Sequence, residues 1–476
     1  MTVAQLSAGL ADGTMTSRSI VEEHLARIAA LDGAFHAVRC LAPDAIEAAD
    51  ASDRIRATSG PRSPIEGIPV LIKDNVDVAG LPTTAGALAL EHSVPVSDAP
   101  LVARLREAGA IILGKTNLSE LANFLTEGMP SGYSALGGQV LNPYDTSITP
   151  SGSSSGSGAA AALGFAPLTI GTETDGSITS PADHQSLVGF KPTVGLVSRT
   201  GVVPIAASQD TAGPMTRTVA DAALLLAAIA GPDPEDPATA EAAGPAAEIA
   251  GLTLDADALR GVRLGVVRGT FPDDEKPDEQ QLACFEEALA ALRDAGALLE
   301  DVVLPEIGID DETLVLHYEF ALGVDAYLAR LGDAAPVRTL AEIGDWNRAH
   351  AAAALKFGQD HVEAAVAIDH DARRAEYSAA RSRDVDVTST GMLAAMGERR
   401  EALVFPGATG CGWASRAGWP SVVVPAGYTE RGRRPVGILL TSRPWSDARL
   451  LNFAYALEQA HPIRRPPSEI NPAAFR

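Results

Sequence analysis

Short apolar runs alternate with helical patterns along most of this chain. Up to residue 57 the apolar positions recur at helical spacing, and Ser17 and Ser19 stand where a helix N-cap is needed. From residue 61 onward, uninterrupted apolar runs that are typical of strands buried on both faces are separated by helical segments. The predicted strands are residues 68–72, 111–113, 168–170, 187–190, 263–267, 298–303, 402–405, 421–425 and 436–441. This alternation predicts an α/β fold in which helices and a sheet form layers.

Two stretches break the alternation. Residues 231–250 are rich in proline, alanine and acidic residues, which favours an exposed loop. Residues 312–400 are largely helical, and we expect them to form a cap or an insertion. We find no internal repeat. We therefore expect a single domain over residues 1–476, with an N-terminal helical segment at 1–60 and a core at 61–230.

Acidic residues dominate the charge of the chain. It has 61 acidic and 37 basic residues, for a formal net charge of -24. Nucleic acids and acidic membranes are bound through clustered lysine and arginine, so neither is an expected partner. Residues 1–30 lack the apolar core of a signal peptide, and apolar stretches such as 222–231 are about half as long as a membrane-spanning helix. Three scattered cysteines indicate neither disulfides nor a zinc site, so we expect a cytoplasmic protein.

Lysine is rare in this chain, and every other basic residue is arginine. The lysines are at positions 73, 115, 191, 276 and 356. Arginine does not lose its proton in proteins, whereas lysine serves as a general base once its pKa is lowered. Lys73 ends the apolar run 68–72. A base that works near neutral pH needs a pKa about three units below that of free lysine, and burial at a strand end acts in that direction.

One motif points to nucleotide binding. Residues 109–116 satisfy the phosphate-loop pattern G-x-x-x-x-G-K-[ST]. A phosphate loop follows a strand and keeps its backbone N–H groups free for phosphate. Here the intervening residues are themselves a predicted strand, so we do not favour a nucleotide site.

A second motif points to a different hydrolase class. Residues 152–156 match the G-x-S-x-G nucleophile elbow, with Ser154 as the nucleophile. The elbow requires a buried strand directly before it, but residues 142–151 are polar and turn-forming. It also requires a histidine, and the downstream candidates lie in ordinary helical contexts: His317, His350 and His361. This interpretation is a weaker alternative.

Two loops of small residues are better candidates for chemistry. A Gly/Ser-rich loop precedes a predicted Ala-rich helix within residues 149–165, and a second small-residue loop follows the strand at 168–170. Such loops let the backbone approach a reacting carbonyl group closely. Successive N–H groups of the second loop could line an oxyanion hole: Thr174, Asp175, Gly176 and Ser177. Either loop alone is also compatible with a simple turn.

Taken together, these segments resemble the amidase signature family. The matching stretches include GIPVLIKDN, GKTNLSELANF, NPYDTSITPSGSSSGSGAA, GTETDGSITSPA, GFKPTVGLVS and SQDTAGPM, between about residues 67 and 231. Weaker similarity continues to PVGILL and WSDARLL. The resemblance implies the family fold, a mixed central β-sheet covered by helices on both faces, with a helical insertion.

The resemblance also implies a catalytic triad. In the family, a lysine and two serines have this role, and their motifs fall on Lys73, Ser153 and Ser177. The implied mechanism passes the proton of Ser177 through Ser153 to neutral Lys73 while Ser177 attacks the carbonyl carbon. The family counterpart of Ser153 sits at a cis peptide bond. Water then hydrolyses the acyl-enzyme, and no metal or organic cofactor is required.

The nucleophile loop departs from the common family pattern. Most members have Gly-Gly before the nucleophile and arginine two residues after it, whereas this chain has Asp175-Gly176 and Thr179. The segment is closest in motif to the branch of bacterial peptide amidases, which remove C-terminal amides from peptides. Residues 183–186 also differ from that branch, and if they line the pocket the substrate differs too. The predicted substrate-binding residues are Met129, Ser131, Gly132, Tyr133, Ser154, Thr179 and His184.

Three functions are compatible with the sequence. The first is a stand-alone serine amidohydrolase, a monomer or homodimer, that acts on peptide C-terminal amides, aryl amides or carbamate (urethane) linkages. The second is the amidase subunit of a glutamine-dependent amidotransferase. The third is an inactive binding protein, which the presence of all three triad residues disfavours. Among these the helical insertion and the nucleophile segment favour the first.

Overall fold

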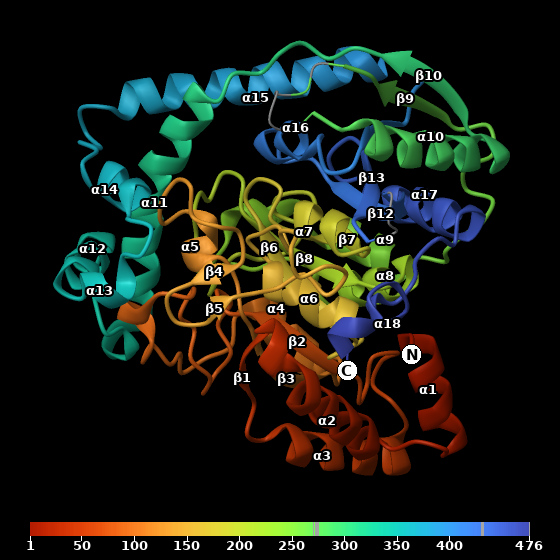
Figure 1. The fold of residues 1–476 in the computed structure, drawn as a ribbon, viewed down its shortest axis with the longest axis horizontal. Coiled ribbons are helices and arrows are strands. Elements are labelled where there is room, and N and C mark those ends of the chain that lie inside the picture. The colour runs from red at the N-terminus through yellow and green to blue at the C-terminus, as the bar shows by residue number, and fades with distance from the viewer. Residues whose placement is uncertain (270, 272–275, 430–432, 476) are drawn as a thin grey trace.

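An eleven-stranded mixed sheet forms the centre of the described part of the protein (Figure 1). The computed structural model describes residues 1–269, 271, 276–429 and 433–475. In spatial order the strands are β1 (Val38–Leu41), β3 (Ile111–Thr116), β2 (Pro69–Lys73), β6 (Leu168–Glu173), β8 (Thr211–Thr216), β7 (Val188–Lys191), β12 (Ser421–Tyr428), β13 (Pro435–Thr441), β11 (Ala402–Pro406), β9 (Arg263–Val267) and β10 (Leu298–Val302). A separate hairpin pairs β4 (Tyr133–Ser134) with β5 (Gly138–Gln139).

Both faces of the sheet are covered, as the alternation of buried side chains shows. Along β11, Val404 packs into one apolar cluster, while Leu403 and Phe405 pack into another. Successive side chains of a strand point to opposite faces, so the two clusters lie on opposite sides of the sheet. β13 alternates in the same way. The prediction of a mixed sheet between helical layers is confirmed.

The helices that form these layers come from most of the chain. Their bounds are α1 (Val3–Asp12), α2 (Ser17–Phe35), α3 (Ala45–Ser59), α4 (Pro100–Glu107), α5 (Glu120–Asn123), α6 (Ser155–Leu163), α7 (Thr179–His184), α8 (Val219–Ile229), α9 (Ala243–Ala250), α10 (Glu279–Asp294), α16 (Cys411–Arg416), α17 (Asp447–Ala460) and α18 (Pro467–Ile470). Thr2 and Thr16 begin α1 and α2 with reciprocal capping hydrogen bonds.

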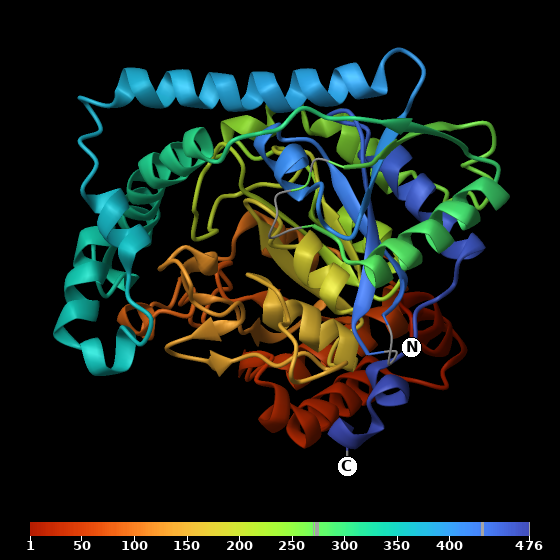
Figure 2. The same cartoon turned by 45° about the horizontal axis from the view of Figure 1, so that its top comes forward.

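The segment predicted as a helical insertion forms five helices: α11 (Asp310–Leu331), α12 (Leu340–Ala349), α13 (Ala351–Ala354), α14 (Asp360–Val366) and α15 (Arg374–Met396). In both views α11 to α14 stand at one side of the sheet, and α15 runs along the edge of the molecule (Figures 1 and 2). Phe320 and Val324 of α11 share an apolar cluster with Leu121 and Met129. The insertion therefore packs against the loop that follows β3.

Parallel pairing positions the two segments that carry the candidate chemistry. β2 is buried along its whole length and pairs in parallel with β3 on one side and β6 on the other. Lys73 is the last residue of β2, and the 174–177 loop follows the last residue of β6. In parallel sheets, ligands bind beyond the carboxyl ends of the strands. Both segments therefore meet at one edge of the sheet.

Three elements differ from the sequence prediction. β1 lies within the segment predicted to be helical, and β8 was not predicted. β1 is a short edge strand without a fully buried residue, so its sequence lacks a strand pattern. The predicted loop at 231–250 contains a 3-10 helix (Pro237–Glu241) and α9. Pro245 is compatible with α9 because it lies in the first turn, where no backbone N–H is needed.

In the described ranges we find no helix with the length and hydropathy required to cross a membrane.

Gly114 provides a test of how tightly β3 and β1 pack. Its φ is +153°, and an added Cβ would lie 2.2 Å from the backbone oxygen of Cys40. Gly114→Ala should lower the free energy of unfolding by at least ~2 kcal/mol, because backbone atoms cannot move aside as a flexible side chain does.

The matched control is Gly244→Ala in α9, where an added Cβ meets nothing within 4 Å. This change should be neutral or slightly stabilising, since alanine has the higher helix propensity. Denaturant unfolding followed by circular dichroism measures both variants. Equal stability of the two variants would contradict the close packing of β1 on β3.

Candidate active site

The amino group of Lys73 is buried and surrounded by oxygen atoms. Lys73 Nζ lies 2.8 Å from Ser153 Oγ, 2.9 Å from Thr172 Oγ1 and 3.3 Å from the Thr172 carbonyl oxygen. Asn75 Nδ2 also donates to Thr172 Oγ1, at 3.0 Å. No carboxylate of the described residues lies within ion-pair distance of Lys73. The hydroxyl of Ser153 is therefore a direct neighbour of a lysine that lacks a counter-ion.

Burial brings the titration of Lys73 close to neutral pH. Desolvation lowers the pKa of Lys73 to about 7, although the charges of Asp210 and Glu173 oppose this shift. A buried ammonium loses its hydration, and here only neutral oxygens replace it. A substantial fraction of Lys73 is thus neutral near pH 7 and able to accept a proton.

Ser153 and Ser154 lie at the start of α6 but have different environments. The Gly152–Ser153 peptide bond is cis. The carbonyl oxygen of Ser153 accepts a hydrogen bond from the Ser119 N–H, at 3.1 Å. Ser154 Oγ donates to the carbonyl oxygen of Thr172 and accepts from the Thr172 N–H, at 3.0 and 3.2 Å. The Ser153 hydroxyl thus faces Lys73, while the Ser154 hydroxyl ties the loop to β6.

Ser177 lies in the loop between β6 and α7, next to the Gly/Ser-rich loop. Its backbone oxygen accepts from the Ser154 N–H at 3.2 Å, and 7% of the residue is exposed. Within the described residues, the N–H groups of all four residues predicted for the oxyanion hole, Thr174, Asp175, Gly176 and Ser177, find no acceptor. Unpaired N–H groups next to a hydroxyl are what an oxyanion hole requires.

Gly176 is required by the shape of this loop. Its φ is +77°, and an added Cβ would lie 3.0 Å from both Cys411 Sγ and Ser180 Oγ. A side chain at this position would therefore strain the backbone and press the loop away from α16. The N–H of Ser180 donates to the Gly176 carbonyl oxygen at 2.7 Å, which turns that oxygen away from the unpaired N–H groups.

Glu173 holds the loop on its other side, and we did not identify it from the sequence. Glu173 Oε2 accepts from the N–H groups of Ile178 and Thr179, at 2.7 and 2.8 Å. Glu173 Oε1 accepts from Ser415 Oγ of α16, at 3.1 Å. The only sequence signal was a carboxylate at the end of a buried strand, where a charged side chain needs hydrogen-bond donors.

Asp210 and Thr172 are two further polar residues that sequence reasoning missed. Thr174 Oγ1 donates to Asp210, whose second oxygen accepts from the N–H groups of Ile205 and Ala206. Burial raises the pKa of Asp210 to about 6, although these hydrogen bonds oppose the shift. Thr172 could have been suspected as a polar residue in a buried strand, but its contact with Lys73 depends on the pairing of β2 with β6.

The predicted pocket residues 129–133 divide into two groups. Ser131 lies beside the Gly152–Ser153 peptide, since an added Cβ at Gly152 would be 3.3 Å from the Cβ of Ser131. The Gly132 N–H donates to Ser119 Oγ at 2.7 Å. Met129 is buried among apolar side chains of the insertion, and the ring of Tyr133 meets Phe357 edge-on at 4.9 Å. This segment joins the insertion to the Ser153 loop.

The remaining predicted pocket residues make contacts inside the protein. Thr179 is fully buried, and its hydroxyl donates to Glu173 at 3.1 Å. His184 Nδ1 lies 3.0 Å from the Ser180 carbonyl oxygen of its own helix. Asp183 accepts from the Gly437 N–H, and Gln185 Nε2 donates to the Pro150 carbonyl oxygen at 3.0 Å. Asp183 and Gln185 thus fix the end of α7 to its surroundings, while His184 makes its contact within the helix.

The structure also argues against both alternative motifs, the phosphate loop and the nucleophile elbow. Residues 111–116 form β3, whose backbone pairs with β1 and β2, so they cannot wrap a phosphate group. Lys115 Nζ pairs with Asp74 at 3.2 Å. In the elbow motif, both hydrogen bonds of the Ser154 hydroxyl go to Thr172. His317 contacts His361 at 3.0 Å instead of a serine.

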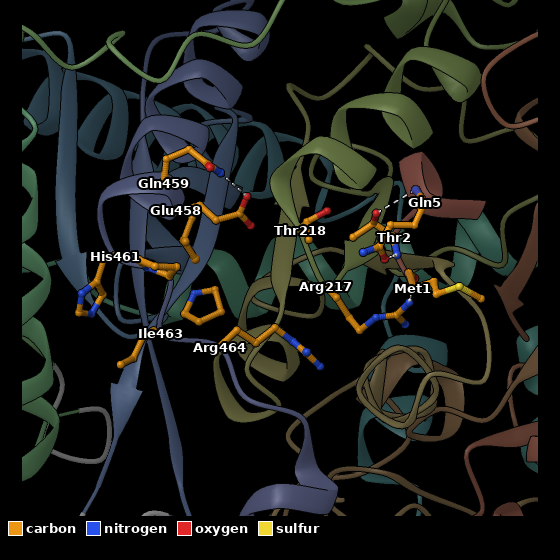
Figure 3. A pocket seen from close by; sticks show the side chains of 13 residues that line it. Met1, Thr2, Gln5, Arg217, Thr218, Glu458, Gln459, His461, Ile463 and Arg464 are labelled. Atoms are coloured by element: carbon orange, nitrogen blue, oxygen red, sulfur yellow. Dashed lines mark hydrogen bonds between the residues drawn. The ribbon is translucent and has the colours of Figure 1, made fainter. Parts of the chain in front are cut away.

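A cavity of about 410 Å³ lies between the ends of α1, α8 and α17, and contains none of the predicted site residues (Figure 3). Arg217 and Arg464 both line this cavity. Arg217 donates to the carbonyl oxygens of Ala161, Ala166 and Met1, and Glu458 on the opposite wall accepts from the Val219 N–H. Arg464 donates through Nε to the Ser186 carbonyl oxygen at 3.0 Å, while its Nη2 is buried without a hydrogen-bond partner among the described residues.

Known proteins resemble this chain over nearly its whole length. A model of the amidase family matches residues 19–451. The chain is 37% identical to a probable amidase of Arabidopsis thaliana, over 98% of this chain and 91% of the relative. The solved native peptide amidase of Stenotrophomonas maltophilia is 42% identical, with a TM-score of 0.91 and 98% of both chains covered. A solved glutamyl-tRNA(Gln) amidotransferase subunit of Thermotoga maritima is 25% identical, with a TM-score of 0.68, covering 96% of this chain and 94% of that one.

These similarities extend over the sheet, the covering helices and the insertion together. The matched region includes the segments that hold Lys73, Ser153 and Ser177. The chain therefore belongs to the amidase signature family and is a hydrolase of carbon–nitrogen bonds.

Proposed function

We propose that this protein is a serine amidohydrolase that cleaves C-terminal amides of peptides, with Ser177 as nucleophile and Ser153 and Lys73 as the proton relay. The observation that carries the proposal is the 2.8 Å contact between Lys73 Nζ and Ser153 Oγ, made by a lysine whose pKa burial lowers to about 7. A neutral amine at this distance accepts the proton of a hydroxyl group. The contact thus supplies the base that a serine nucleophile needs.

The proposed reaction begins with neutral Lys73. Ser177 Oγ attacks the carbonyl carbon of the amide as its proton passes to Ser153 Oγ, while the Ser153 proton passes to Lys73 Nζ. The carbonyl oxygen becomes an oxyanion, which the unpaired N–H groups of Asp175, Gly176 and Ser177 stabilise. The C–N bond then breaks as the leaving ammonia takes a proton from Ser153, which regains one from the Lys73 ammonium. Water hydrolyses the ester at Ser177 in the same sequence of proton transfers.

Similarity to the peptide amidase of Stenotrophomonas maltophilia supports the substrate class. That structure shares 42% identity and a TM-score of 0.91, and both chains are covered to 98%, which includes the insertion beside the Ser153 loop. Aryl amides and carbamates have the same reacting carbonyl group, and we retain them as secondary substrates. Cytoplasmic location and a monomeric or homodimeric state remain part of the proposal.

The amidotransferase alternative has one supporting observation. Subunits of glutamyl-tRNA(Gln) amidotransferases are among the relatives, and one from Symbiobacterium thermophilum is 34% identical over 96% of both chains. The Thermotoga maritima structure, however, superposes with a TM-score of only 0.68. The peptide amidase is thus more similar in both sequence and backbone, and we favour the stand-alone enzyme.

A substrate panel tests the proposed activity. The purified chain should release ammonia from peptide C-terminal amides without any partner, whereas Ser177→Ala should release none. Anilides, esters, carbamates and free glutamine complete the panel. Hydrolysis of glutamine alone, or activity that requires a co-purified partner protein, would favour the amidotransferase alternative.

Labelling with a fluorophosphonate tests the identity of the nucleophile. Ser177→Ala should abolish labelling because the attacking oxygen is removed, while Ser154→Ala should still be labelled because the Ser154 hydroxyl is committed to Thr172. Mass spectrometry of the labelled peptide locates the adduct. An adduct on Ser154 would refute our assignment.

The pH dependence of the activity tests the role of Lys73. Only the neutral amine accepts a proton, so kcat/KM should fall about tenfold per pH unit below the Lys73 pKa of about 7 and level off above it. Lys73→Met should lower kcat/KM by about a thousandfold. Lys73→Arg should not restore activity, because arginine keeps its proton.

The control for these variants is Lys276→Met, which changes an exposed lysine and should retain the parent profile. A flat profile between pH 5 and 9, or full activity of Lys73→Met, would rule out lysine as the base.

A further inference from the structure

Four charged side chains from separate elements gather behind the 174–177 loop. Asp175 belongs to the loop, Glu312 to α11, Asp384 to α15 and Arg416 to α16. The last three are almost fully buried, with exposed fractions of 6%, 5% and 4%. We call these residues the rear charge cluster. Charges so far from water influence one another strongly, because little solvent screens them.

Arg416 is the common partner within the rear charge cluster. Its Nη2 pairs with Glu312 Oε2 at 2.5 Å, and its Nη1 lies 3.5 Å from Asp384 Oδ1. Nη1 also donates to the Gly308 carbonyl oxygen at 2.6 Å. The guanidinium thus connects the first turns of the insertion to α16.

Asp175 faces the same guanidinium without an ion pair to it. An added Cβ at Gly412 would lie 3.6 Å from both carboxylate oxygens of Asp175 and 4.0 Å from Arg416 Nε. Both groups therefore border the bare backbone of Gly412. Asp175 Oδ1 and Arg416 Nε are each buried without a hydrogen-bond partner among the described residues. The two charges act on each other through space.

The charges of the cluster do not balance. Three carboxyl groups surround one guanidinium, and the nearby Arg381 uses its Nη atoms on the carbonyl oxygens of Arg416 and Ser208. Burial, and then the charge of Asp175, raise the pKa of Glu312, while the charge of Arg416 opposes this shift. Arg416 is thus one positive charge shared by three carboxyl groups, and Asp175 is among the charges that raise its pKa.

The charge balance of the cluster matters because Asp175 is part of the 174–177 loop. Its backbone N–H is one of the unpaired N–H groups of the 174–177 loop. Its carboxylate is therefore only a few bonds from the place where a negative charge develops during attack. An uncompensated carboxylate there would repel the oxyanion and oppose the N–H groups.

We infer that Arg416 is a positioning residue of the active site that neutralises Asp175, so that the 174–177 loop can stabilise an oxyanion. Arg416 is buried, and its direct contacts are to Glu312, Asp384 and the Gly308 carbonyl oxygen, so it acts through Asp175. The inference rests on the proposed function of Ser177 as nucleophile and of the loop as oxyanion hole. It also explains how a carboxylate is tolerated where most family members have glycine.

Steady-state kinetics of Arg416 variants on a peptide amide test this inference. Arg416→Gln should lower kcat by about a hundredfold with little change in KM, because the interaction lost is one made in the transition state. Arg416→Lys keeps the charge but loses the planar fork, and should stay within about tenfold of the parent.

A double variant separates charge from structure. In a chain that already carries Asp175→Asn, Arg416→Gln should cost at most a few-fold in kcat, because no carboxylate is left to neutralise. Arg383→Gln is the matched control, because Arg383 of α15 pairs with Asp311 of α11 near the protein surface. This substitution should leave kcat unchanged. Unfolding curves of all variants verify that each is folded.

Two results would overturn the inference. One is an equal loss of kcat for Arg416→Lys and Arg416→Gln. That result would mean that the hydrogen-bond geometry of the guanidinium matters and its charge does not. The other is an equal cost of Arg416→Gln with and without Asp175→Asn. If Arg416→Gln does not fold, Arg416→Lys is measured with and without Asp175→Asn instead, and an equal loss of kcat in both backgrounds would overturn the inference. Failure of the proposed function is recognised separately, because it would appear as full activity or labelling of Ser177→Ala.

Discussion

The burial of one lysine amino group at the carboxyl end of β2 is the constraint on which the site depends. Lys73 is fully enclosed, and its Nζ has only hydroxyl and carbonyl oxygens as close partners. Water would stabilise the ammonium form of Lys73, and a carboxylate within ion-pair distance would do the same. By excluding both, the protein keeps the pKa of Lys73 near 7 and its proton exchangeable. A surface lysine with the same hydroxyl neighbour would stay protonated.

The sheet order makes this environment possible. β2 lies between β3 and β6, so its last residue is shielded on both sides, and β6 brings Thr172 beside it. The Gly/Ser-rich loop then closes the remaining side with Ser153. Three segments spread over about a hundred residues of sequence thus share one small volume, and none of them provides the site alone.

The 174–177 loop is held in place by contacts with several surrounding segments. Glu173 binds the backbone after Ser177 and is itself held by Ser415 of α16. Gly176 lies against Cys411 at the start of the same helix. The insertion approaches this region through Glu312, which pairs with Arg416 of α16. An oxyanion hole works only if its N–H groups are fixed before the reaction begins, and these contacts restrict the loop to one conformation.

The sequence by itself determined the α/β class, most strands, the family, and which lysine and serines to examine, because apolar periodicity and local motifs are properties of neighbouring residues. It missed β1, β8 and α9, where short or mixed segments lack a clear period. It assigned Ser154, Thr179 and His184 to the pocket, but could not show that their side chains form hydrogen bonds with Thr172, Glu173 and Ser180. Only the tertiary structure could place Thr172, Glu173 and Arg416 around the site, because burial and hydrogen-bond partners depend on strand pairing and helix packing over long sequence distances.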